Sequence, residues 1–150
     1  MTSSRVLGED APQGFIPSAL AWPGTALTGR VLLTLPYWWS GVAKTLDFPG
    51  AVAESRGLGL HPAVLIVVAT ISVKLLGSLS VISGRWRWLG AGALGVFTAF
   101  ATLLAHGFWT IHDPALRMQQ FTSFLEHIGL IGGFVLSAVT LQPPRSGSRR

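Results

Sequence analysis

Residues Gln119 to Leu141 read QQFTSFLEHIGLIGGFVLSAVTL, an apolar stretch long enough to cross a bilayer as a helix. Glu126 and His127 lie inside it, and an ionised carboxylate in hydrocarbon costs about 3 kcal/mol on insertion scales. On a helix, the small and polar residues of the stretch share one stripe: Thr122, Glu126, Gly129, Gly133 and Ser137. We therefore predict that Glu126 faces the interior of a helix bundle and needs a partner.

Three further apolar stretches precede this one, which predicts an all-α integral membrane protein, an antiparallel four-helix transmembrane bundle. We expect one membrane domain over residues 27–142, with helices at about 27–46, 61–83, 89–110 and 119–141. A short interfacial helix at Phe48 to Arg56 is expected after the first, because Asp47 can cap it and Gly57 can end it. Residues 1–26 are expected to be a flexible cytosolic segment, and residues 143–150 a basic disordered tail.

The composition agrees with a membrane protein and argues against other classes. Of the 150 residues 49% are hydrophobic and 11% charged, and the mean hydropathy is +0.52. The formal charge of +5 is spread over segment ends and the tail, so nucleic acid is not an expected partner and the lipid bilayer is. Because there is no cysteine, the chain cannot supply a disulfide or a thiol redox centre.

The distribution of basic residues predicts the orientation, since cytoplasmic loops of membrane proteins are rich in lysine and arginine. One side would hold Arg5, Arg30, Arg85, Arg87, Arg145, Arg149 and Arg150. The other side would hold Lys44, Arg56 and Arg117. We therefore expect a multi-pass protein with both termini in the cytosol.

Lys74 is the other charge deep in an apolar stretch, so we predict an intramembrane ion pair between Lys74 and Glu126. Two roles stay open. The pair could fix the register of two helices, or it could handle protons or bind a ligand, because charged groups within membranes often mark functional pathways.

A candidate ligand pocket is expected near Pro36, which should kink the first helix. The pocket would comprise Tyr37, Trp38, Trp39, Thr102, His106, Trp109 and His127. The aromatic residues either pack the bundle or form a stacking wall for a flat ligand such as a quinone. No two histidines are four residues apart on a helix, so neither a metal nor a haem site is expected. We interpret Gly90, Gly92, Gly132 and Gly133 as a close-packing surface.

Three stretches resemble the DoxX family of small four-helix bacterial membrane proteins, and together they span about Arg30 to Leu141. The first is RVLLTLPYWWSGVAKTLDFPG at Arg30 to Gly50. The second is HGFW at His106 to Trp109, and the third is QQFTSFLEHIGLIGG at Gln119 to Gly133. In the family pattern an acidic residue stands at the position of Lys74, and Lys-Asn stands at Glu126-His127. The exchanged charges favour a direct contact with a structural role.

The resemblance implies a membrane subunit of a redox or stress-response assembly in the bacterial inner membrane. Relatives include the membrane subunit of thiosulfate:quinone oxidoreductase, so any enzymatic role would be that of an accessory subunit of a quinone-linked oxidoreductase. A soluble or membrane oxidoreductase subunit is then the expected partner. No cofactor is expected within the chain itself, quinone is the candidate ligand, and no catalytic residue is predicted.

Two other functions stay open. The chain could be a non-catalytic membrane scaffold that binds a partner protein. It could also be a small-solute or proton transporter, which would need a homo-oligomer because four helices leave little room for a pore.

Overall fold

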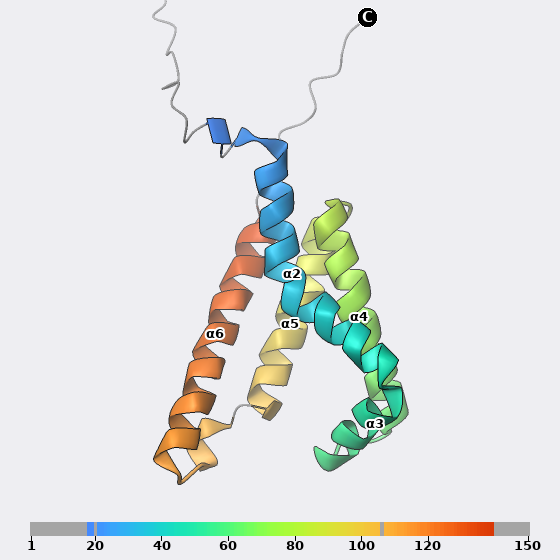
Figure 1. Cartoon of the computed structure of the whole chain (residues 1–150), viewed down its shortest axis with the longest axis vertical. Coiled ribbons are helices and arrows are strands. Elements are labelled where there is room, and N and C mark those ends of the chain that lie inside the picture. The colour runs from blue at the N-terminus through green and yellow to red at the C-terminus, as the bar shows by residue number, and fades with distance from the viewer. Residues whose placement is uncertain (1–17, 20, 106, 140–150) are drawn as a thin grey trace, which may run out of the picture.

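The computed structural model describes residues 18–19, 21–105 and 107–139, and this part of the chain is helical without strands (Figure 1). Its elements are α2 (Pro23–Leu46), α3 (Phe48–Gly57), α4 (Ala63–Ser83), α5 (Arg87–Ala105), the 3-10 turn η1 (Phe108–Thr110) and α6 (Pro114–Val139). Most of the expected N-terminal segment, and all of the expected tail at 143–150, lie outside the described residues.

Three stretches are long and apolar enough to cross a membrane: α4, the segment Arg87–Thr110 and α6. The remaining long helix, α2, has 24 residues but includes Arg30 and Lys44, and it does not reach the same apolarity. Three of the four predicted membrane helices are thus supported by length and composition. Pro36 lies inside α2, and Figure 1 shows this helix changing direction along its length, as predicted.

Local capping explains where α3 and α6 begin. The side chain of Asp47 accepts a hydrogen bond from the backbone N–H of Gly50 at 3.0 Å, which caps α3 as predicted. Asp113 accepts one from the N–H of Leu116 at 2.8 Å, so α6 already begins at Pro114 and not at Gln119. The segment expected as one helix over 89–110 ends at Ala105, and a separate turn follows at η1.

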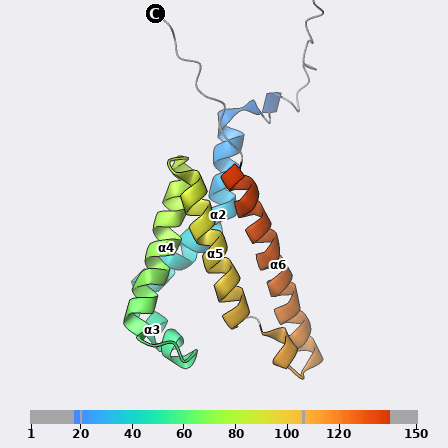
Figure 2. The same ribbon diagram turned by 180° about the vertical axis from the view of Figure 1, so that it is seen from behind.

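The helices pack as a row, with α4 between α2 and α5, and α5 between α4 and α6. Figures 1 and 2 show α6 separating from α4 and α3 toward the end where α3 lies. Close packing between α2 and α6 is limited, and Phe134 is the buried side chain of α6. The ring of Phe134 meets that of Tyr37 edge to face, with centroids 5.2 Å apart. This aromatic contact joins the two ends of the row.

Glycine permits a close approach between α4 and α5. A Cβ added at Gly90 would lie 2.7 Å from the carbonyl oxygen of Gly77 and 2.7 Å from Cβ of Ser80. Gly133 lies similarly close to Leu33, so the predicted close-packing surface is found at Gly90 and Gly133. The prediction is wrong for Gly92 and Gly132. A Cβ added at either glycine would meet no other described atom within 4 Å, and both glycines are exposed on the outer faces of their helices.

We expect Gly90→Ala to lower the free energy of unfolding by about 1–3 kcal/mol, because the new methyl group meets backbone that cannot move aside. Denaturation in detergent, followed by circular dichroism, measures the change. Gly92→Ala is the matched control in the same helix, and it should cause no loss. Equal losses in the two variants would contradict the α4–α5 packing described above.

Candidate functional site

A cavity of about 430 Å³ lies among the helices and is lined by residues of α2, α3, α4, α5 and α6. Its walls are largely apolar, with Phe97, Phe100 and Leu104 on α5 and Leu130 on α6. Its polar groups include Ser40, Lys44, Glu54, Ser55, Lys74 and His127. An apolar cavity with a few convergent polar groups is the usual form of a small-molecule site.

Lys74 on α4 directs its amine toward α2 and α5. The Nζ atom donates a hydrogen bond to the hydroxyl oxygen of Ser40 at 2.8 Å and lies 5.3 Å from the centroid of the Phe97 ring. The second contact is a cation–π interaction, since an ammonium is attracted to the face of an aromatic ring within about 6 Å. A hydroxyl and a ring thus hold the ammonium, and neither of them cancels its charge.

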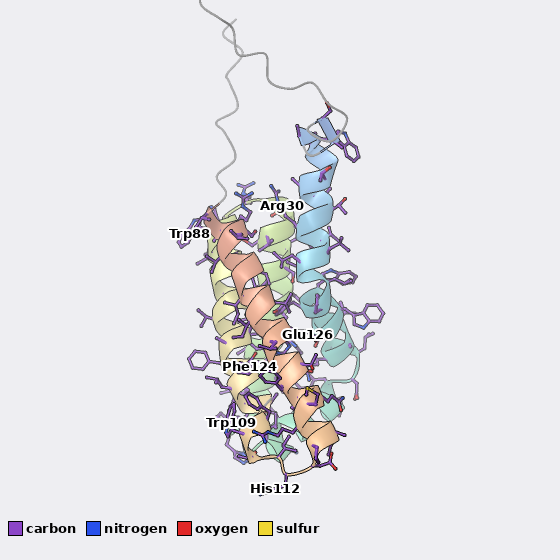
Figure 3. The ribbon with its side chains drawn as sticks, turned by 90° about the vertical axis from the view of Figure 1, so that its left-hand side faces the viewer. Arg30, Trp88, Trp109, His112, Phe124 and Glu126 are labelled. Carbon is purple, nitrogen blue, oxygen red and sulfur yellow. The ribbon has the colours of Figure 1, made fainter. Side chains whose placement is uncertain are left out.

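The ion pair in the described part of the chain joins Lys44 and Glu54, not the predicted Lys74 and Glu126. The prediction of a Lys74–Glu126 contact is wrong because α5 lies between α4 and α6, which keeps the two side chains apart. Glu126 is exposed, on the part of α6 shown in Figure 3. Lys44 and Glu54 instead connect the end of α2 to α3 at the cavity.

Two threonines one turn apart on α5 attach both neighbouring helices. Thr98 donates to the carbonyl of Leu94 at 2.6 Å, so its oxygen accepts a hydrogen bond from the hydroxyl of Tyr37 at 2.6 Å. Thr102 likewise donates to the carbonyl of Thr98 at 2.6 Å, so its oxygen accepts from Nδ1 of His127 at 2.8 Å. Each hydroxyl is satisfied twice, once within α5 and once across a helix interface.

The structure brings only part of the predicted pocket together. Tyr37 and His127 line the cavity, and Thr102 holds His127. The tryptophans do not line it: Trp38 and Trp39 contact each other edge to face, and Trp109 packs against Phe108. Successive helical residues point about 100° apart, so three consecutive aromatics cannot all face one cavity. His106 lies outside the described residues.

Sequence inspection missed Ser40, Lys44, Glu54, Ser55 and Phe97. Helical spacing could have found two of them, because Ser40 is three residues after Tyr37 and Lys44 four after Ser40, which places them on one face. Nothing in the sequence indicates that α3 folds back to supply Glu54 and Ser55. No three His, Asp or Glu side chains of the described ranges could together hold a metal ion.

We expect Thr98→Val to lower the free energy of unfolding by about 1–3 kcal/mol, because the buried hydroxyl of Tyr37 loses its acceptor. In the double variant with Tyr37→Phe the loss should be smaller than the sum of the two single losses, by about 1 kcal/mol. Unfolding in detergent measures both values. Thr45→Val is the control, since among the described residues the hydroxyl of Thr45 bonds only to Gly41 of its own helix. Strict additivity of the two changes would exclude the Tyr37–Thr98 hydrogen bond.

Comparison with protein-family models gives a match to DoxX over residues 25–107, which is more than half of the chain. The matched range includes nearly all of α2 and the whole of α3, α4 and α5, and therefore most of the cavity wall, and it ends before α6. Neither a curated protein nor a solved structure matches the chain. Its apolar helices and this family match together establish that the chain is a membrane protein of the DoxX family.

Proposed function

We propose that this DoxX-family protein is a membrane subunit of a redox or stress-response assembly, and that it holds a lipid-soluble quinone in the cavity at Lys74. The observation that carries the proposal is an apolar cavity with a half-buried amine on its wall. The volume of about 430 Å³ lies within the range of roughly 300–1,000 Å³ that is usual for small-molecule sites.

The cavity offers what a quinone head group needs. Its carbonyl oxygens accept hydrogen bonds, and the ammonium of Lys74 is a donor that is already oriented by Ser40. The ring of Phe97 gives a flat surface beside the same amine. Because the chain has no cysteine, we propose that a partner oxidoreductase subunit supplies the electrons and that this chain is an accessory subunit.

We also propose that α2 is the fourth span of an antiparallel four-helix bundle in the bacterial inner membrane, with both termini in the cytosol. The arginines support this orientation. The guanidinium of Arg30 lies beside Gly84 in the turn that also carries Arg85 and Arg87, and Figure 3 shows Arg30 and Trp88 near the same end. Trp109 and His112 lie near the opposite end. The described residues place three basic side chains toward each end, so the proposed orientation rests on the further arginines of the two terminal segments in the sequence, Arg5, Arg145, Arg149 and Arg150.

The wild-type protein in detergent should bind a short-chain ubiquinone saturably, as measured by quenching of tryptophan fluorescence. Lys74→Met should weaken this binding roughly tenfold, about 1.4 kcal/mol, because the charged donor is lost. Arg117→Met is the matched control, since it removes an exposed positive charge on α6 outside the cavity. Equal affinities of wild type and Lys74→Met would contradict the proposed site.

If the chain is an assembly subunit, another protein should co-purify with it in a gentle detergent, together with a quinone detectable by mass spectrometry. A co-purifying protein without quinone would favour a non-catalytic scaffold. The exposed length of α6 is the observation that supports this second candidate, because it leaves a long surface for a partner. A scaffold should retain its partner in the Lys74→Met, Glu126→Leu double variant. Purification without any partner would count against both functions.

A further inference from the structure

The charges that line the cavity do not cancel. Lys44 and Glu54 neutralise each other as an ion pair, whereas Lys74 contacts the neutral hydroxyl of Ser40 and the ring of Phe97. No carboxylate of the described residues lies within ion-pair distance of the Lys74 amine. A half-buried ammonium among apolar side chains without a counter-ion is unfavourable, so an anion bound beside it would be stabilised.

A second polar group on the cavity wall also lacks a partner. Ser55 on α3 is 6% exposed, and its hydroxyl has no hydrogen-bond partner among the described residues. Most buried hydroxyls in proteins are hydrogen-bonded, and an unsatisfied one costs about 1–3 kcal/mol. Ser55 lines the same cavity as Lys74, so a ligand in the cavity can satisfy it.

The rest of the wall is apolar. Phe100 and Leu104 on α5 and Leu130 on α6 line the cavity, and Pro36 contributes from α2. Apolar surface of this kind favours a hydrocarbon segment, while Lys74 and Ser55 favour a polar head group. The cavity therefore combines an uncompensated positive charge, a free hydroxyl and a hydrophobic wall.

We propose that the cavity binds an amphiphile with an oxyanion head group, of the carboxylate class, and a single hydrocarbon chain. The oxyanion pairs with the ammonium of Lys74, the hydroxyl of Ser55 donates to the head group, and the chain lies along α5 and α6. The proposal rests on the proposed function for the position of the ligand, which is the same cavity at Lys74. It differs in the chemistry of the ligand, which is an acidic amphiphile and not a neutral quinone.

The test compares laurate with methyl laurate, which share a chain and differ in the charge of the head group. At equal free concentration, the wild-type protein in detergent should bind laurate about tenfold more tightly. Lys74→Met should abolish this preference, whereas Lys74→Arg and the control Arg117→Met should keep it. Ser55→Ala should weaken laurate binding roughly fivefold, as expected for one lost hydrogen bond. It also provides an independent readout if Lys74→Met fails to fold.

Equal binding of laurate and its methyl ester by the wild-type protein would overturn the proposal, as would a preference that survives in Lys74→Met.

Binding of short-chain ubiquinone, measured in parallel, separates the acidic ligand proposed here from the quinone of the proposed function. Quinone binding without acid preference would support the proposed function alone, and acid preference without quinone binding would support the acidic ligand alone. Displacement of laurate by phosphatidylglycerol in nanodiscs would overturn the carboxylate class and the single chain, because this lipid has a phosphodiester head group and two chains. Lack of displacement would support the single-chain carboxylate.

Discussion

The packing of this protein depends on the polar face of one helix, α5. A threonine in a membrane helix can donate its hydroxyl proton to the carbonyl oxygen four residues earlier. Its own oxygen then remains available to accept a hydrogen bond from a neighbouring helix. Thr98 and Thr102 both do so, and the neighbours are Tyr37 of α2 and His127 of α6. Because lipid offers no competing water, such cross-helix hydrogen bonds and close backbone contacts are the main specific forces between the helices. The helix α5 therefore sets the positions of both ends of the row.

The cavity is a consequence of that arrangement. The Gly77–Gly90 contact brings α4 and α5 together, while the threonines hold α2 and α6 at α5 without bringing α2 and α6 into close contact along their length. The space that remains is lined by Lys74 and Ser40 on one side and by His127 and Leu130 on another. The ion pair between Lys44 and Glu54 fastens α3 to the end of α2, so that Ser55 also faces this space.

The sequence alone predicted the parts of the structure that depend on local chemistry. Apolar length identified three of the helices, and Asp47 was recognised as the cap of α3. The pairing of helices was not predictable in the same way. The prediction that the stripe through Glu126 faces the bundle interior was wrong, because Thr122, Glu126 and Gly129 are exposed. A stripe does not say which neighbour it meets, and α5 lies between α6 and the helix of Lys74. The cavity was half predicted, through Tyr37 and His127, because the contribution of α3 depends on tertiary folding.

The absence of a Lys74–Glu126 contact and the presence of the cavity have the same cause, which is that α6 packs against α5 and not against α4. A carboxylate delivered to Lys74 from α6 would require α6 to lie against α4, and that packing would fill the space that Leu130 and Phe97 now line. With α6 held on the far side of α5, the ammonium stays beside a hydroxyl and a ring, and its charge remains uncompensated by the described residues. A purely structural lysine gains nothing from this placement, since a membrane interior strongly disfavours charge. The position of Lys74 becomes favourable when a ligand in the cavity supplies the opposite charge or a strong hydrogen-bond acceptor.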